Sequence, residues 1–383
     1  MIKNLYISQV YNSFGEKTLK VSIKTEKGIY SARSPCGTSR SKYEAKTLKL
    51  EKIIKNFPQI KKKFIGKREE DVDKIIHNLG INKIGANLSI ALSIASWRAR
   101  SENKVYEILE PKARKFPFPV GNVMGEWLKG SIQEFLVIPT KAKNIKEAIE
   151  TNFLIWKDVG GILKYFKICK GKNYEGAWIT NLDDIKKLEL LSDVAKTYGA
   201  SIGLDMASTH FYKKGKYVYS KLKKKLKPDE QLEFVIELIK NYKIIYVEDP
   251  FQENDFKRFS ELRKKVRCFI VGDDLFATQP QRLKKGVKKK SGNSILIKPD
   301  QAGTVSKTLE TIKIAKEYNF ATIISHRSKD TIDTFISDLA VGTKSPMIKC
   351  GIWGKERKAK LKRLVEIWDK VKKPSMQNLK VFI

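Results

Sequence analysis

The sequence lacks a disulfide framework, a zinc motif and any long apolar run. Its four cysteines are scattered, with no Cys-x-x-Cys pair: Cys36, Cys169, Cys268 and Cys350. This distribution excludes a disulfide-stapled secreted scaffold and a cysteine zinc site. No apolar run approaches the length needed to span a bilayer, and "MIKNLYISQV" has neither the apolar core nor the cleavage site of a secretory signal. We therefore expect a cytoplasmic protein that does not contact membranes.

Acidic residues are also scarce. The sequence has 42 Asp and Glu residues but 77 Lys and Arg residues, which gives a formal net charge of +35. Such a field attracts polyanions. Lysine runs occur at 213–227, 283–292 and 354–363, but none matches a sequence-specific nucleic-acid motif, and aromatics interleave only at Tyr217 and Tyr219. Two interpretations stay open: solvated outer helices in a lysine-rich protein, or a surface for non-specific nucleic-acid binding.

Residues 1–112 have the pattern of a small α+β domain. "NLYISQVYNS" and "KTLKVSIKT" predict a β-hairpin turning at Gly15, and "GIYSARS" predicts a third strand. Helical spacing of apolar residues covers roughly 44–64 and 86–101. The basic, proline-rich "EPKARKFPFPV" that follows is expected to be a linker.

Residues 113–383 alternate short apolar runs with amphipathic helical stretches. This alternation predicts a parallel sheet covered by helices, and the length fits a (β/α)8-type barrel, an α/β fold. Charged or polar residues stand at the ends of these runs: Asp205, Glu248, Asp273, Lys298, His326, Arg327 and Lys349, with Gln133 and Glu134 preceding "FLVIPT". Because barrel strands converge at one face, these side chains are expected to form an active-site ring.

Three carboxylates in this ring suit a metal ion. Asp205, Glu248 and Asp273 offer the hard oxygen ligands that Mg²⁺ prefers, whereas zinc would call for histidine or cysteine. A lysine near a metal and other cations is expected to have a lowered pKa, so Lys298 can serve as a general base.

The remaining cations describe a substrate. Arg327 offers a planar fork for a phosphate, with the Ser328 hydroxyl beside it, and Lys349 offers a point charge for a carboxylate. Together with the metal ligands, these residues predict a small phosphorylated acid that loses a proton next to its carboxylate.

Several ordered segments carry a family resemblance: "PCGTSRSKYEA", "IGANLSIALSIA", "QEFLVIPTKAK", "IGLDMASTHFYKKGKY", "VEDPFQENDF", "IVGDDLFATQP", "LIKPDQAGT", "SHRSKDTIDTFISDLAVG" and "IKCG". Along almost its whole length the chain resembles the enolase family. The resemblance implies a barrel with a smaller N-terminal α+β domain, a homodimer, and the glycolytic, Mg²⁺-dependent dehydration of 2-phosphoglycerate to phosphoenolpyruvate.

The resemblance also implies individual roles, by position. The catalytic residues would be the base, the acid and the partner of the acid: Lys298, Glu175 and Glu134. Two Mg²⁺ sites are expected, with these ligands: Asp205, Glu248 and Asp273 for the first, and Ser39 of a mobile loop for the second. The substrate-binding residues would be Lys349 for the carboxylate, Arg327 and Ser328 for the phosphate, and His326 and Gln133 beside them.

Two segments depart from the family pattern. The lid segment "GNVMGEWLKGSIQEF" is shorter and has no histidine, and "NYEGA" places Tyr174 where the family has an acidic residue. Trp127 and Trp178 add bulk near these loops. Among the chain's histidines, His210 is expected in a surface turn and His77 in a structural role.

Two hypotheses follow from these departures. In the first, the chain is an enolase with an altered lid and reduced or altered activity. In the second, it is an enolase-like paralogue with altered or lost activity, whose basic surface binds RNA or another polyanion.

Overall fold

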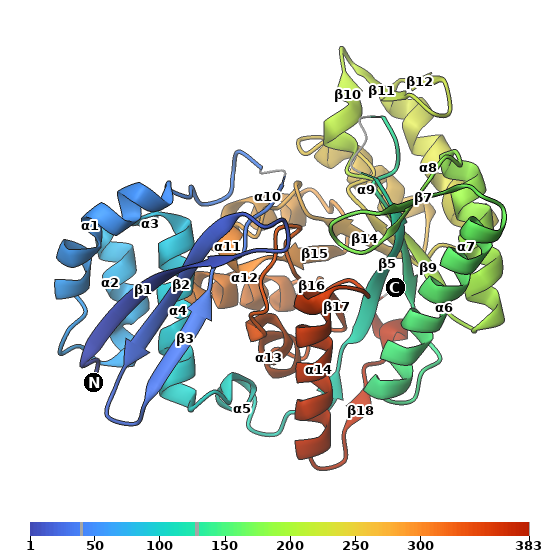
Figure 1. The fold of residues 1–383 in the computed structure, drawn as a ribbon. Helices are drawn as coiled ribbons and strands as arrows, with labels where there is room; N and C mark the ends of the chain where they lie inside the picture. Colours follow the sequence, from blue (N-terminus) through green and yellow to red (C-terminus); the bar gives the residue numbers. More distant parts are fainter. Residues whose placement is uncertain (39–40, 127–129, 383) are drawn as a thin grey trace.

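Figure 1 shows the chain in a computed structural model, which describes residues 1–38, 41–126 and 130–382. Three strands near the N-terminus form an antiparallel sheet in the order β1 (Asn4–Tyr11), β2 (Lys17–Lys24) and β3 (Ile29–Arg33). Tyr11 pairs with Lys17, and Gly15 in the turn between them has a φ of 73°. The predicted hairpin and third strand are confirmed.

Five helices follow this sheet: α1 (Leu50–Lys62), α2 (Val72–Leu79), α3 (Ile81–Ile84), α4 (Ala86–Ser101) and α5 (Val105–Leu109), with the 3₁₀ turn η1 (Glu69–Asp71) between α1 and α2. The helix predicted to begin near residue 44 begins only at Leu50. The α4 helix packs on β2 and β3 and also on α11 (Pro299–Ala302) of the barrel, so it is buried on almost all sides. Its small residues, as in "ANLSIALSIAS", suit this double contact.

The barrel is closed by eight strands: β5 (Phe118–Gly125), β6 (Glu134–Ile138), β9 (Ser201–Asp205), β13 (Tyr246–Glu248), β14 (Phe269–Gly272), β15 (Ser294–Ile297), β16 (Ala321–Ser325) and β17 (Met347–Lys349). β17 pairs with β5 and completes the ring. The sequence patterns missed β5, because its proline and glycine residues are typical of a linker.

One barrel strand differs from the all-parallel expectation. β6 runs antiparallel to both β5 and β9. The physical reason is the connection: the described residues between β5 and β6 contain no helix, so the chain returns in the opposite direction. The other barrel pairings are parallel.

Helices surround the barrel: α6 (Ile145–Tyr165), α7 (Asp184–Thr197), α8 (Pro228–Tyr242), α9 (Phe256–Lys265), α10 (Pro280–Lys288), α11 (Pro299–Ala302), α12 (Val305–Glu317), α13 (Phe335–Gly342) and α14 (Lys355–Lys370). Smaller elements are the hairpin β7 (Cys169–Lys172) and β8 (Trp178–Thr180), the pair β4 (Lys115–Phe116) and β18 (Ser375–Met376), and the turns η2 (Ser208–Phe211) and η3 (Leu379–Val381). No helix in the described part of the chain combines the length and the apolarity that crossing a bilayer requires.

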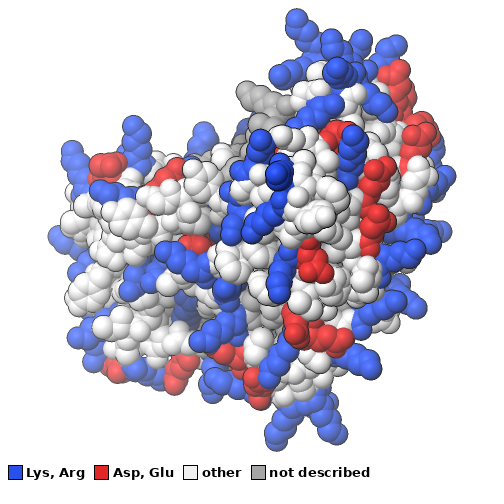
Figure 2. Space-filling view, turned by 45° about the vertical axis from the view of Figure 1, so that its right-hand side comes forward, with Lys and Arg blue, Asp and Glu red and all other residues white. Residues whose placement is uncertain are grey.

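The first lysine run forms a small sheet of its own, with strands β10 (Tyr212–Lys213), β11 (Lys216–Tyr219) and β12 (Lys224–Leu226). Figure 2 shows Lys and Arg side chains gathered at the top of the molecule, where Figure 1 places these strands. Tyr217 and Tyr219 are buried, and the Tyr219 hydroxyl bonds to the Gln231 side chain. Both rings therefore belong to the core, so the two aromatics that interleave with this lysine run in the sequence do not support a base-stacking platform.

Candidate active site

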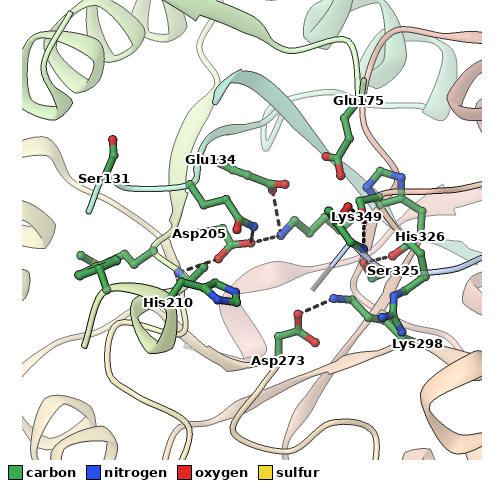
Figure 3. Close-up of a pocket in the computed structure, with 18 residues that line it drawn as sticks. Ser131, Glu134, Glu175, Asp205, His210, Asp273, Lys298, Ser325, His326 and Lys349 are labelled. Atoms are coloured by element: carbon green, nitrogen blue, oxygen red, sulfur yellow. Dashed lines mark hydrogen bonds and ion pairs between the residues drawn. The ribbon is translucent and has the colours of Figure 1, made fainter. Parts of the chain in front are cut away.

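A cavity of about 240 Å³ opens at the C-terminal ends of the parallel barrel strands (Figure 3). Most residues predicted for the site line it: Gln133, Glu134, Glu175, Asp205, Asp273, Lys298, His326, Arg327, Ser328 and Lys349. Glu248 is fully buried beside them, and its carboxylate lies 2.8 Å from the Lys349 ammonium. Ser39 and Trp127 lie outside the described residues. The ring expected from the strand ends thus exists as one cavity.

Strand register brings three carboxylates together. Asp205 on β9 pairs with Glu248 on β13 and with Glu134 on β6. Because β6 is antiparallel, its first residue, not its last, lies at the cavity. This explains why Glu134 precedes its apolar run, whereas the other site residues follow theirs.

Lys349 lies at the centre of these carboxylates (Figure 3). Its Nζ is 2.8 Å from both Asp205 Oδ2 and Glu248 Oε2, and 3.0 Å from Glu134 Oε2. Burial alone would lower the pKa of Lys349, but the three carboxylates hold it well above its ordinary value. Burial also raises the pKa of Glu248, to about 8, and the neighbouring Asp205 adds to this shift.

On the opposite wall, Lys298 forms an ion pair with Asp273. Burial would raise the pKa of Asp273, but Lys298 outweighs it and the pKa is lowered. Burial would likewise lower the pKa of Lys298, yet Asp273 raises it above the ordinary value. The sequence led us to expect a lowered pKa for Lys298, and this expectation is wrong for the structure described. The reason is that Lys298 is paired with a carboxylate rather than surrounded by cations alone.

The carboxylates fit a hard cation. Glu248 Oε1 is buried and accepts no hydrogen bond within the described part of the chain, so an ion beside it would satisfy this atom. Carboxylate oxygens of Asp249, Asp273 and Asp274 also lie within 4.8 Å of one another. Asp249, however, accepts hydrogen bonds from the backbone N–H groups of Asp273 and Asp274, at 3.1 and 2.7 Å, so its role is to fix the end of β14.

Arg327 is held in place by buried carboxylates. Its Nη1 lies 2.7 Å from Asp300 Oδ2 and 2.9 Å from Glu44 Oε2. Burial would lower the pKa of Arg327, but these two carboxylates raise it, so the guanidinium keeps its charge. Glu44 comes from the N-terminal region, and the sequence patterns named neither it nor Asp300, because each acts through Arg327.

The two neighbours of Arg327 are polar groups in different surroundings. Ser328 Oγ accepts a hydrogen bond from the Thr38 backbone N–H at 2.8 Å and lies 2.6 Å from the Thr38 hydroxyl. His326 is buried, and its Nδ1 is 3.9 Å from Asp330 Oδ2. Burial, with the nearby Arg357 and Lys360 charges, lowers the pKa of His326 well below its ordinary value, so the imidazole is neutral.

Glu175 reaches the cavity from the loop between β7 and β8 (Figure 3). Its side chain is buried, and Oε2 accepts no hydrogen bond from the described residues. Burial raises the pKa of Glu134 well above its ordinary value, and Glu175 adds to this shift while Lys349 opposes it. The two glutamates are thus electrostatic neighbours.

The histidines outside the strand ends differ from each other. His210, expected in a surface turn, is exposed in η2 but also lines the cavity. No spacing rule indicated this, because the loop after β9 folds back over the strand end. His77 lies on α2 with Nε2 3.4 Å from the Thr304 hydroxyl, which agrees with a structural role.

Comparison with known proteins shows which family the chain resembles. Residues 114–380 match the family model described as "Enolase, C-terminal TIM barrel domain". The chain is 34% identical to the enolase of Archaeoglobus fulgidus, over 98% of this chain and 99% of that protein. It is 35% identical to the enolase of Methanosphaera stadtmanae, over 99% of each. A third relative, the enolase of Natronomonas pharaonis, is 34% identical over 96% of this chain and 98% of its own.

Proposed function

The chain belongs to the enolase family, and we propose that it is a lyase that dehydrates 2-phosphoglycerate to phosphoenolpyruvate with Mg²⁺. One observation carries the proposal. Strand register brings together the carboxylates of Glu134, Asp205 and Glu248. Across the same cavity lies the ion pair between Asp273 and Lys298. We also propose the division into an N-terminal domain of residues 1–112 and a barrel domain of residues 113–383.

Asp205, Glu248 and Asp273 would hold the first Mg²⁺ ion. Ser39 is proposed to reach the second ion. When bound, the metal supplies positive charge that stabilises the negative charge developing on the substrate carboxylate. With Asp205, Glu248 and Asp273 engaged as ligands, Lys298 would lose its present partner, and Lys349 would keep only Glu134 of its three. Lys349 then donates to the substrate carboxylate, and Lys298 faces the α-carbon as an amine.

The reaction divides between two residues. Lys298 takes the proton from the α-carbon, and its electron pair moves toward the carboxylate. As the carbon–carbon double bond forms, the hydroxyl on the neighbouring carbon leaves with a proton from Glu175, as water. Glu134, beside Glu175, helps to keep that proton available, and Gln133 holds Asp205 through a hydrogen bond of 3.5 Å. Arg327, with Ser328 and the neutral His326 beside it, binds the phosphate throughout.

Turnover of 2-phosphoglycerate by the purified protein tests the proposal, with phosphoenolpyruvate followed by its ultraviolet absorbance. We expect turnover that needs Mg²⁺, stops with a chelator, and is abolished in Lys298→Ala. Lys313→Ala is the matched control, because Lys313 is exposed on α12 outside the cavity. Mg²⁺-independent turnover, or full activity in Lys298→Ala, would reject the mechanism. No turnover in a protein that binds Mg²⁺ would favour the enolase-like paralogue.

Further features of the family remain proposals for this chain: a homodimer, tested by sedimentation equilibrium, and a glycolytic role in the cytoplasm. The exposed lysines of β10–β12 favour a second function, non-specific nucleic-acid binding. We expect RNA binding that weakens steeply with salt and is reduced by joint replacement of Lys213, Lys214 and Lys216 by serine. Binding that is insensitive to salt would contradict this second function.

A further inference from the structure

An aromatic contact joins the N-terminal sheet to the loop that carries Glu175. Phe14, in the turn between β1 and β2, stacks on Tyr174, in the turn between β7 and β8. The ring centroids are 4.2 Å apart and the planes differ by 27°. Tyr174 directly precedes Glu175, so the stack lies one residue from the group that we propose as the acid.

The inner side of this loop is fixed by polar contacts and an indole. Asn173 Oδ1 accepts hydrogen bonds from the Glu175 and Ala177 backbone N–H groups, at 2.9 and 3.0 Å. The indole Nε1 of Trp156 donates to the Gly176 carbonyl at 2.8 Å. Gly176 has a φ of 83°, and a Cβ there would lie 2.8 Å from Trp353 Cβ. The loop is therefore packed tightly on this side, and Phe14 covers Tyr174 from the other.

The β1–β2 turn, which carries Phe14, is itself hydrogen-bonded to the barrel next to Arg327. Ser13 N donates to the Asp330 carbonyl at 2.8 Å, and Ser13 Oγ donates to the Ser328 carbonyl at 3.0 Å. The Lys329 ammonium lies 5.3 Å from the Phe14 ring centroid. The β1–β2 turn thus bridges the segment after β16 and the Glu175 loop, and both of these segments contribute residues to the cavity.

We propose that Phe14 and Tyr174 are positioning residues for Glu175. The stack holds the outer side of the loop so that the Glu175 carboxyl points into the cavity, at a fixed distance from the segment that binds the phosphate. Neither Phe14 nor Tyr174 is among the residues that line the cavity, so the effect passes through the backbone of residues 173–177. This inference rests on the function proposed above, because it concerns the acid of that reaction.

Steady-state kinetics of four variants tests the inference: Tyr174→Ala, Phe14→Ala, the double variant, and Tyr174→Phe as the matched control. A stacked pair of this kind predicts that either alanine variant lowers kcat by about three- to tenfold while KM changes little. The double variant should be no slower than the single ones, because each removes the same contact. Tyr174→Phe keeps the ring and should restore the wild-type kcat.

Hydrogen exchange of the backbone amides of residues 175–177 gives a readout without substrate. These amides should exchange faster in Tyr174→Ala and Phe14→Ala than in the wild type and in Tyr174→Phe. Tyr174 is 62% exposed, so its replacement should leave the fold intact. Wild-type exchange in the alanine variants, or kcat losses that multiply in the double variant, would overturn the inference. If the alanine variants exchange faster than the wild type, but the wild type does not turn over 2-phosphoglycerate, then the proposed function is rejected while the role of the stack in holding the loop stands.

Discussion

The cavity has two sides that hold their functional groups by different means. We call Glu44, Asp300, Arg327 and Ser328 the ionic side, and Trp156, Tyr174, Glu175, Gly176 and Trp353 the aromatic side. On the ionic side, buried carboxylates contact the guanidinium directly, at 2.7 and 2.9 Å. On the aromatic side, rings and an indole N–H hold the backbone around Glu175, whose Oε2 accepts no hydrogen bond from the described residues.

The difference follows from what each group has to do. A phosphate-binding Arg327 must stay charged, and opposite charges beside it raise its pKa and stabilise that state. An acid must gain and lose a proton in each turnover. A fixed cation paired with Glu175 would stabilise the carboxylate and oppose protonation. The contacts on the aromatic side instead hold the backbone around Glu175.

The largest expected effect concerns the aromatic side. Glu175→Gln keeps the shape of the side chain but removes the transferable proton, so kcat should fall by about 10²- to 10⁴-fold. The free energy of unfolding should change little, because the loop is held through its backbone. Kinetics with 2-phosphoglycerate and urea unfolding measure the two quantities. Glu26→Gln, at an exposed site beside Lys3, is the control. A large loss of stability with kcat unchanged would show that Glu175 supports the fold rather than acting as the acid.

On the ionic side, stability is expected to suffer as well as binding. Arg327→Met leaves the buried Asp300 and Glu44 without their cation, which should lower the free energy of unfolding by about 3–5 kcal/mol. Urea unfolding measures this loss. Lys27→Met, which breaks an exposed ion pair with Glu102, should leave stability unchanged. If both variants unfolded like the wild type, the ionic side would not be held by charge.

Another ion pair joins helix α4 of the N-terminal region to the barrel, and the pH dependence of its contribution to stability sharpens the comparison. Arg98 Nη2 lies 2.8 Å from Asp333 Oδ1. Burial would raise the pKa of Asp333, but Arg98 and the Phe335 and Arg33 backbone N–H groups lower it. A lowered folded-state pKa means that this pair stabilises the fold above the unfolded-state pKa, and that the gain is lost as pH falls through the folded-state pKa.

Asp333→Asn should therefore cost about 1.5–3 kcal/mol at neutral pH, since it replaces charge-assisted hydrogen bonds by neutral ones. The difference between variant and wild type should shrink as the solution is acidified below the pKa of a free aspartate. Urea unfolding across a pH series measures both. A difference that stays constant down to the lowest pH would show that Asp333 contributes through packing rather than charge.

The smallest expected effect again concerns the aromatic side. Trp156→Phe keeps a stacking ring but removes the donor to the Gly176 carbonyl, which should cost about 1 kcal/mol of unfolding free energy. The measurement is urea unfolding, and Trp368→Phe is the control, because Trp368 packs edge-on against Phe116 without a hydrogen bond from its indole to the described residues. Equal losses in the two variants would show that ring packing, not the indole N–H, supports the loop.

Much of the fold could be predicted from local pattern. The β1–β2 hairpin, the third strand and the alternation in the barrel all follow from residue periodicity and turn residues. β5 could not be predicted, because its prolines and glycines are typical of a linker and only its pairing with β17 and β6 makes it a strand. The direction of β6 could not be predicted either, since a strand pattern of period two is the same in both directions. Its antiparallel pairing with β5 and β9 appears only in the folded chain.

The sequence by itself determined which charged residues end the barrel strands, because a buried apolar run stops where a charge must reach a polar cavity. From these residue types alone came the expected oxygen ligands, the lysines and the arginine. The tertiary structure decided which of them are partners: Lys349 with Asp205, Glu248 and Glu134, but Lys298 with Asp273. It alone placed His210 in the cavity and Phe14 on Tyr174. Such contacts join residues far apart along the chain, and only strand register and domain packing bring them within reach.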